Sequence, residues 1–516
     1  MTYTVVWFKR DLRIFDHAPL AHAAARGPVL CLYVLEPGIW RQPDCALQHY
    51  EFLRESLRDL AQQLRVLGAR LQLAVGELTD VLSRLHALQP FARLVSHQET
   101  GNSVTYARDL AVARWCRAQG VSWQEWPQHG VVRCLPSRDR WLGMWQSHMA
   151  ADRVAAPLPA SLRSVCLPWR TAWPEPSAIG LLDDHQVPLR QRGGRTAGQQ
   201  VLDDFLNVRC ANYRGGISSP LSAADACSRL SPYLSSGSLS MREVVQATRQ
   251  QQRQLTGLRD PESRRLHQGL VAFMSRLHWH CHFIQKLESE PEIEWRNLHQ
   301  GYDGLRESAH NADYFEALQA GRTGWPLVDA CVAMLRETGW LNFRMRAMLV
   351  SVASFPLWLH WRPVGLWLAR QFLDYEPGIH WSQMQMQAGT TGINALRVYN
   401  PLKQAQDHDP GGVFVRHWLP ALQQVPDAWI FEPWQMPLQL QARCGVRVGT
   451  DIASPLVDLA EATRVAKSGV YAVRARPSVR SAKAAILQKH GSRDHLSQRR
   501  NRPDQSPAPL QRSLEW

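Results

Sequence analysis

The first 130 residues alternate short apolar runs with amphipathic stretches. The apolar runs are Val5–Phe8, Pro28–Leu35, Arg70–Gly76, Arg93–Gln98 and Val121–Trp126, and helical periodicity lies between them at Ala46–Leu67, Leu78–Leu88 and Val104–Gln119. Strands that alternate with helices form a parallel, doubly wound sheet. No GxGxxG motif follows the first run, so the pattern argues against a nucleotide site of the NAD type.

After Thr196 the strand signals end, and helical patterns continue to about Val473. Leu327–Leu373 is apolar on nearly every turn, interrupted by a few arginines and one aspartate whose charges must be matched inside the protein. Such a segment belongs in the middle of a large helical domain, near a bound anionic or aromatic cofactor.

These patterns divide the chain into four parts. We expect an α/β domain at 1–136, a proline-rich connection at 137–195, a helical domain at 196–475 and a basic tail at 476–516, with a short helix at Ser481–His490 that frays afterwards. A chain of 516 residues exceeds what one hydrophobic core usually supports, which agrees with two domains.

Composition indicates the cellular compartment and limits the metal and disulfide chemistry that the chain can support. No apolar run is long and uncharged enough to cross a bilayer, and the N-terminus lacks the order of a secretory signal, so a cytoplasmic protein is expected. The ten cysteines are scattered without a CxxC pair, which argues against a zinc site, an iron–sulfur cluster or a disulfide framework. We expect no metal and a monomer.

The net charge is +14, and residues 472–516 hold ten Lys/Arg against three Asp/Glu. Lysine and arginine displace the counterions condensed on nucleic acid, so this balance suits a polyanionic partner. A solvated tail that only aids solubility explains the last residues equally well.

Three groups of residues in the helical half carry chemistry. Tyr213 and the run Ser228-Arg229-Leu230-Ser231 precede a helix expected at Ser240–Gln250, and hydroxyls with a guanidinium are typical of a phosphate site, although a helix-capping turn has the same composition. Arg344 and Arg346 lie in the apolar segment, and Asp374 is the natural carboxylate partner, either beside a cofactor or as an internal clamp.

Aromatic residues form the third group. They crowd Phe273–Phe283 and recur at Trp340, Trp358, Trp361, Trp367 and Trp381. Each one alone is best interpreted as core filler, whereas a set near a cofactor could pass electrons or stack bases.

Together these groups resemble one family. The segments WFKRDLR, SRLSPYLSSG, TGWPLVDACVAMLRETGW, HWR, GTTGINALRVYNP and FVRHWLP, from about residue 4 to 475, are similar to the DNA photolyase/cryptochrome family. The resemblance implies a Rossmann-like antenna domain followed by an all-α domain that holds a folded FAD. It implies FAD contacts from Tyr213, Ser228, Arg229, Leu230, Ser231, Arg346, Asp374, Tyr375, Glu376 and His380, the last facing flavin N5.

The resemblance also implies a reaction and a partner. In this family reduced flavin, excited by blue light, donates one electron to a pyrimidine dimer flipped out of DNA. The residues matched to catalysis are Trp279, Arg276, Arg344 and His380, and those matched to DNA contact are Arg276, Trp279, Arg344, Met386, Arg397 and Lys403.

This chain departs from the family at several positions. Arg276 replaces a glutamate that bonds the dimer, Phe343 replaces an asparagine, and Met386 replaces a second stacking tryptophan. Met384 replaces the tryptophan nearest the flavin, and a thioether is no hopping site, so electron transfer is expected through Trp361 with Trp381 or Trp358.

The resulting hypothesis is a photolyase that repairs cyclobutane dimers in UV-damaged DNA. Its rivals are a cryptochrome-like photoreceptor that signals through its tail from about Arg474, a flavin oxidoreductase unrelated to DNA, and, more weakly, a (6-4) photolyase. Thr105 stands where the family commonly has a folate-binding glutamate, so methenyltetrahydrofolate, a deazaflavin or no antenna chromophore all stay open.

Overall fold

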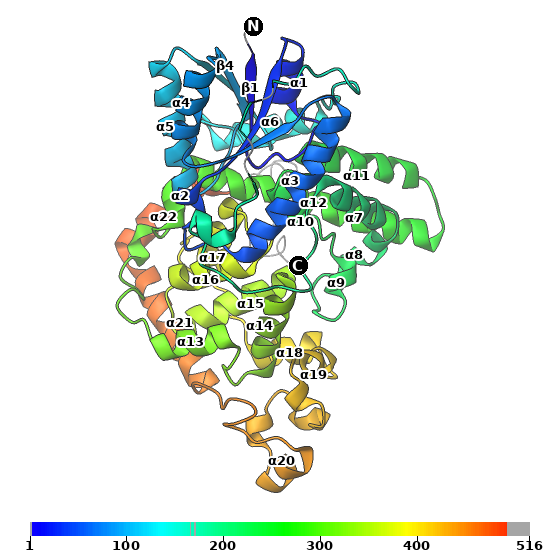
Figure 1. Ribbon diagram of the computed structural model, residues 1–516. Helices are drawn as coiled ribbons and strands as arrows, with labels where there is room; N and C mark the ends of the chain where they lie inside the picture. Colours follow the sequence, from blue (N-terminus) through cyan, green and yellow to red (C-terminus); the bar gives the residue numbers. More distant parts are fainter. Residues whose placement is uncertain (1–2, 166, 170–171, 493–516) are drawn as a thin grey trace, which may run out of the picture.

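A computed structural model describes residues 3–165, 167–169 and 172–492. Figure 1 shows an α/β domain above a larger helical domain, with α20 at the far end of the helical part. The expected fold class, a parallel α/β domain followed by a largely helical domain, is confirmed.

The five expected strands all form one parallel sheet. They are β1 (Thr4–Phe8), β2 (Val29–Leu35), β3 (Leu71–Val75), β4 (Arg93–His97) and β5 (Ser122–Trp126), in the order β3-β2-β1-β4-β5. Thr4 of the central strand pairs with Val29 on one side and Arg93 on the other. Because every residue of β1 is buried, this strand forms the middle of the domain core.

Helices cover both faces of the sheet. The side chains of Val6 and Phe8 pack with α1 (Ala18–Ala24) and α3 (Leu47–Val66), whereas those of Val5 and Trp7 pack with α4 (Leu78–Leu88) and α5 (Ser103–Ala118). This alternation follows from the two-residue period of a strand. The predicted helices of this domain are therefore confirmed to within a residue at each end, and α1 and the single-turn α2 (Pro37–Trp40) are additional.

The connection expected at 137–195 is not all loop. Residues Arg138–Ala150 form α6, with Ser137 as its N-cap and Trp141, Trp145 and Met149 buried at a spacing of four residues. The clustered prolines that follow concealed this stripe. Farther along, the backbone N–H of Val29 donates to Arg163 and that of Val165 donates to Val29. Part of the connection therefore pairs with the first residue of β2 through an isolated parallel bridge.

The rest of the described chain is helical, as expected. Its α-helices are α7 (Arg195–Asn207), α8 (Tyr213–Gly216), α9 (Ala223–Ala226), α10 (Ser231–Ser235), α11 (Met241–Leu255), α12 (Pro261–Ser289), α13 (Ala312–Ala320), α14 (Pro326–Thr338), α15 (Phe343–Ser354), α16 (Trp361–Gln371), α17 (Pro377–Ala388), α18 (Pro401–His408), α19 (Val413–Trp418), α20 (Leu438–Cys444), α21 (Leu459–Ala475) and α22 (Pro477–His490). Ser240 caps α11, which ends five residues later than expected, at Leu255.

The helix predicted at Ser481–His490 is α22, which begins earlier, at Pro477. The fraying expected beyond it lies mostly outside the described residues. No helix of the described chain meets the length and hydropathy needed to span a bilayer.

The apolar segment Leu327–Leu373 forms α14 to α16 and the centre of the helical core. Its aspartate, Asp329, is matched by hydrogen bonds and not by a cation: Oδ1 accepts from the backbone and hydroxyl of Thr323, and Oδ2 accepts from the backbone of Gly324. Burial nevertheless raises the pKa of Asp329 to about 6. The TGWPLVD run therefore forms the N-terminus of α14, and the hydrogen bonds of Asp329 hold that end of the helix in place.

Candidate functional site: a cavity in the helical domain

The core of the helical domain contains a cavity of about 730 Å³, its mouth included. α15 and α17 supply most of the wall, the turn Phe372–Glu376 closes one end, and Ser231 of α10 and His280 of α12 complete it. The wall is mainly apolar, with Ala347 and Val350 among its residues. A pocket of this kind excludes water from whatever it holds.

Arg346 and Asp374 meet in this cavity as the sequence predicted. Two guanidinium nitrogens lie 2.9 and 3.1 Å from the two carboxylate oxygens, and the Ser231 hydroxyl donates to Oδ2 at 2.6 Å. Burial alone would raise the pKa of Asp374, but the charge and hydrogen bonds of Arg346 together with the bond from Ser231 lower the pKa below its ordinary value. The Arg346 side chain also lies 4.1 Å from the centre of the Phe372 ring, so the charge is held rigidly.

His380 lines the opposite wall in a defined tautomer. Its Nε2 lies 2.9 Å from the carbonyl oxygen of Gly365, and since a carbonyl only accepts, Nε2 carries the proton and Nδ1 is an acceptor. Burial lowers the pKa of His380 to about 4, so the ring is neutral at physiological pH. Another wall residue, His280, has a buried Nδ1 with no hydrogen-bond partner among the described residues.

The residues present fit FAD. An unsatisfied buried nitrogen at His280 indicates a polar ligand, and Arg346 provides a fixed cation beside an apolar wall, which suits an anionic ring system. Ser231, Arg346, Asp374, Tyr375, Glu376 and His380, all expected from the sequence, line the cavity. His280, Phe372 and Gln383 line it as well, and no sequence pattern marked them individually.

Four residues expected at the cofactor pyrophosphate lie outside this wall. The Tyr213 ring packs against Phe205 and Phe273, and the Leu230 side chain is in the same core. Arg229 lies 4.0 Å from the centre of the Trp340 ring and donates to the Gln191 side chain at 3.1 Å. Arg229 has a positive φ of 60°, so the Ser228–Ser231 turn is tight and directs its backbone toward α10.

Two of the three expected electron-transfer tryptophans form a continuous path with the cavity wall. The rings of His380 and Trp381 are 4.9 Å apart, those of Trp381 and Trp361 are 5.9 Å apart, and both tryptophans are buried. Met384 lines the cavity where the family position was matched. Trp358 is partly exposed, has a φ of 52° and lies 4.5 Å from Arg306, in a separate cluster packed on α21.

None of the residues matched to DNA contact is in the lining of the cavity. Arg276, Trp279 and His280 share one side of α12 by helical spacing, and His280 lines the cavity. Burial lowers the pKa of Arg276 to about 10, so the side chain keeps its charge at neutral pH. Met386 is half-buried on α17, Arg344 is on α15, Arg397 is in the loop after α17, and Lys403 is exposed on α18.

A salt bridge between the two domains reaches the same cavity. Arg10, which follows β1, donates to Glu376 at 2.6 Å, and its Nε donates to the carbonyl oxygen of Ser235. Glu376 is 5% exposed, so the pair joins the α/β domain to the turn that closes the cavity. The sequence placed Arg10 inside a family motif but assigned it no role.

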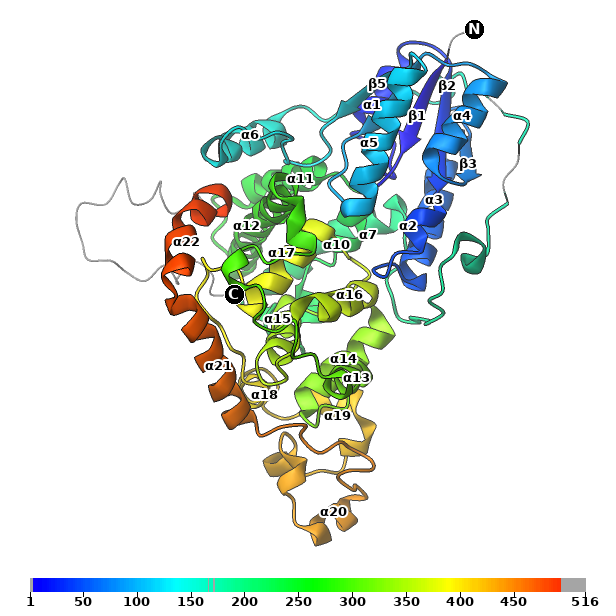
Figure 2. The same cartoon turned by 90° about the vertical axis from the view of Figure 1, so that its left-hand side faces the viewer.

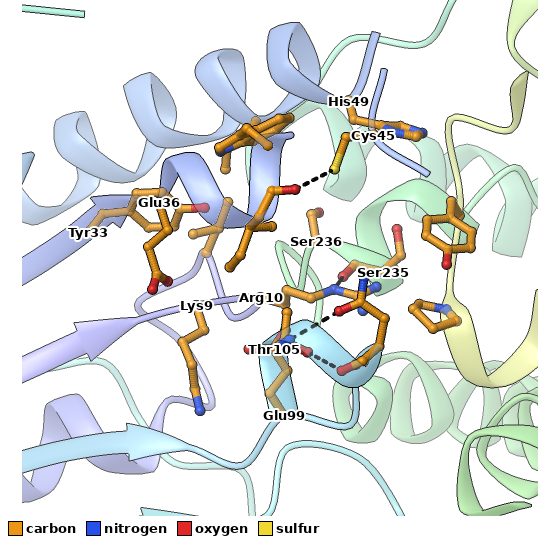
Figure 3. Close-up of a pocket in the computed structure, with 18 of the residues that line it drawn as sticks. Lys9, Arg10, Tyr33, Glu36, Cys45, His49, Glu99, Thr105, Ser235 and Ser236 are labelled. Carbon is orange, nitrogen blue, oxygen red and sulfur yellow. Dashed lines mark hydrogen bonds between the residues drawn. The ribbon is translucent and has the colours of Figure 1, made fainter. Parts of the chain in front are cut away.

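A second cavity of about 1130 Å³ lies between the domains, and Arg10 and Tyr375 line it (Figure 3). Its polar wall includes Lys9, Glu36, Glu99 and Thr105. Burial raises the pKa of Glu36 to about 7 despite its bond to Arg108. The Thr105 hydroxyl donates to the backbone carbonyl of Asn102, and the carboxylates of this cavity belong to Glu36, Asp44 and Glu99.

Near the second cavity, Asp11, His17 and His97 form a buried cluster. Asp11 Oδ2 lies 3.0 Å from His17 Nε2 and 2.7 Å from His97 Nδ1, and the backbone of Lys9 donates to Oδ1. The Leu20 backbone donates to His17 Nδ1, so Nε2 carries the proton and donates to Asp11. These bonds satisfy the hydrogen-bonding capacity of the Asp11 carboxylate. We therefore interpret the cluster as structural.

The fold and the cavity define a two-domain flavin-binding protein of the photolyase type. Residues 4–138 match the family model "DNA photolyase", and residues 273–472 match "FAD binding domain of DNA photolyase". The chain is 31% identical over 485 residues to the deoxyribodipyrimidine photo-lyase of Streptomyces griseus, covering 90% of this chain and 98% of that protein. The chain therefore belongs to the DNA photolyase/cryptochrome family.

Relatives with other names are nearly as similar. A cryptochrome DASH from Gloeobacter violaceus is 28% identical over 492 residues, covering 90% of this chain and 95% of that protein. The crystal structure of a cryptochrome from Synechocystis sp. PCC6803 superposes with a TM-score of 0.80 at 23% identity, over 91% of this chain and 99% of that one. The family thus includes both light-driven enzymes and cryptochromes at similar distance.

Proposed function

We propose that this protein is a light-driven, FAD-dependent lyase that splits cyclobutane pyrimidine dimers in DNA. The observation that carries the proposal is the placement of Arg276 and Trp279 on the side of α12 that leads to the cavity of Arg346 and Asp374. An aromatic platform and a cation next to a flavin cavity suit a base that has been rotated out of the duplex.

When bound, reduced FAD supplies one electron under blue light and takes it back after the ring opens. The protein's own contribution is the environment. Arg346 places positive charge at the ring, Asp374 and Ser231 keep that side chain oriented, and Ala347 and Val350 exclude water. His380 offers an acceptor at Nδ1 because its other nitrogen donates to Gly365.

On the substrate side, Trp279 provides a stacking face and Arg276 provides donors. A guanidinium can donate to the carbonyl oxygens of a pyrimidine dimer but cannot accept from its N–H groups, the reverse of the glutamate that the family usually has. Arg344, Arg397 and Lys403 would contact phosphates, which carry no sequence information, and Met386 would pack against the second base.

The direct test is repair by the reduced protein. Incubation with a dimer-containing oligonucleotide under blue light should lower the dimer content, measured by chromatography, while a dark sample stays unchanged. Equal dimer content in the two samples would reject repair.

Two findings favour the cryptochrome-like receptor as the second candidate. Met386 and Met384 stand in place of a substrate-stacking and an electron-relay tryptophan, and Met384 lines the cavity. A receptor that signals through the chain after Arg474 should show light-dependent cleavage by trypsin in that region. A cleavage pattern that is identical in light and dark would remove this alternative.

We also propose that the cavity between the domains holds the antenna chromophore, either methenyltetrahydrofolate or a deazaflavin. Glu36 and Glu99 offer acceptors for ring N–H groups, although Arg108 already bonds both. The absorption spectrum of the purified protein tests this, because a second near-UV or blue band should accompany the flavin bands.

A further inference from the structure

The last two described helices carry an excess of positive charge. Residues 459–490, which comprise α21 and α22, contain seven Lys/Arg and one acidic residue, Glu461. Figure 2 shows the two helices, orange to red, running along one side of the helical domain. All of α22 lies beyond residue 472, where the match to the FAD binding domain ends.

The cations are arranged in two stripes. Arg464, Lys467, Tyr471 and Arg474 recur at intervals of three or four on α21. The N-cap of α22, Arg476, is followed at the same intervals by Arg480 and Lys483. Such spacing puts each set on one face of its helix. Tyr471 adds an aromatic ring that is 53% exposed.

The stripes meet in a groove of about 780 Å³. Tyr471, Arg474, Arg480 and Lys483 line it together with Gly392. Within the described chain these three cations have no carboxylate partner within salt-bridge distance, whereas Lys489 at the far end of α22 lies 2.8 Å from Glu290. Uncompensated cations that converge on one groove create a positive potential that attracts phosphates.

The groove adjoins the candidate site. Gly392 belongs to the loop that leads from α17, a wall of the flavin cavity, toward α18. Leu396 and Val398 of this loop pack in one apolar cluster with Val470, Val473 and Val479 of the two helices. The loop thus joins the cavity wall to the basic groove by direct packing.

We propose that the groove between α21 and α22 binds the phosphodiester backbone of duplex DNA outside the segment that enters the flavin cavity. The inference rests on the proposed function only in taking the polyanion to be DNA. Tyr471 would pack against a sugar or an unpaired base, and Arg474, Arg480 and Lys483 would each contact a phosphate. The groove would then add phosphate contacts to a chain whose substrate-side residues Arg276, Phe343 and Met386 differ from the family pattern.

The test is the salt dependence of binding to a long, undamaged duplex in the dark. The triple variant Arg474→Gln/Arg480→Gln/Lys483→Gln should lower the slope of log affinity against log salt by roughly 2–3, because each phosphate contact contributes about 0.9. The matched control Arg65→Gln/Arg114→Gln/Arg117→Gln removes the same charge from α3 and α5, and its slope should equal that of the wild type.

One further variant separates charge from a folding defect. The variant Arg474→Lys/Arg480→Lys keeps the positive charge of the groove and should therefore keep the slope of the wild type.

Equal slopes for the wild type and the triple variant would overturn the inference. If the triple variant also lost binding to phosphatidylserine vesicles while its DNA slope stayed unchanged, the groove would be a membrane-binding surface instead. Because these assays use neither light nor dimers, they are independent of repair. A wild type that repairs dimers while the triple variant keeps the full slope would refute the groove and leave the proposed function intact.

Discussion

At the scale of single residues, Trp279 carries the proposed contact with the lesion. Its ring packs against His282 and Phe283 with one side of α12 behind it, so the platform is rigid. Trp279→Ala should weaken binding to dimer-containing DNA by about 1–3 kcal/mol, the usual contribution of base stacking. Trp295→Ala, which truncates another partly exposed tryptophan, should leave the affinity unchanged. Equal affinities for the two variants in a titration would contradict the assignment.

His380 predicts a pH effect at the same scale. Its pKa is lowered to about 4 by burial, so between that value and the ordinary value near 6.5 the unfolded chain binds a proton that the folded chain does not. Stability must therefore fall as the pH is lowered through this window, by up to about 3 kcal/mol for this histidine.

Both His380→Asn and His380→Gln should flatten the dependence of unfolding free energy on pH between about 6.5 and 4. Urea unfolding followed by tryptophan fluorescence provides the measurement. Variants that lose the same stability at every pH would show that His380 matters only for packing.

At the scale of elements, α16 and α17 form the route for photoreduction. Trp381 on α17 bridges His380 and Trp361, with ring centres 4.9 and 5.9 Å away. Trp381→Phe should slow light-driven flavin reduction by an external donor, because phenylalanine is not readily oxidised. Trp367→Phe on α16 is the control, since Trp367 has no ring contact with this path among the described side chains. Absorbance under steady blue light follows the reaction, and equal rates in both variants would exclude the route.

Elements also show how far sequence patterns reach. α6 was missed although Trp141, Trp145 and Met149 keep a spacing of four, because the prolines after it dominated the segment. In the turn Ser228–Ser231, which the sequence predicts as a phosphate site, Ser231 lines the flavin cavity and bonds to Asp374, and the contacts expected of Ser228, Arg229 and Leu230 stay a prediction. A local motif specifies a turn but not the direction in which its side chains point.

At the scale of the whole molecule, Arg10 and Glu376 couple the domains. Arg10→Gln would leave a carboxylate that is 5% exposed without its cation, and breaking such a pair costs about 3–5 kcal/mol. Burial already raises the pKa of Glu376, and loss of Arg10 should raise it further. When the pKa of a carboxyl is higher in the folded than in the unfolded protein, its contribution to stability is present at low pH and is lost as the pH rises through the folded-state pKa. The Arg10→Gln variant should therefore be less stable at pH 8 than at pH 5.

Thermal unfolding at the two pH values measures this effect. The double variant Arg10→Gln/Glu376→Gln removes the titrating group and should show no such difference. Arg464→Gln, which breaks the exposed pair with Glu461 on α21, serves as the surface control and should leave the melting temperature unchanged. A single variant that melts as the wild type does at both pH values would show that the domains do not depend on this pair.

By itself, the sequence determined the five strands and three of the helices of the α/β domain, the helical second half and the partnership of Arg346 with Asp374. Each follows from local periodicity, or from the need to match a charge in an apolar segment. Only the tertiary structure decided that Arg10 reaches Glu376 across 366 positions, that His280 lies in the cavity wall, and that two basic helices meet in a groove. These contacts depend on how the helices and strands pack together. Packing brings together residues that are far apart in the sequence, and no sequence pattern relates their positions.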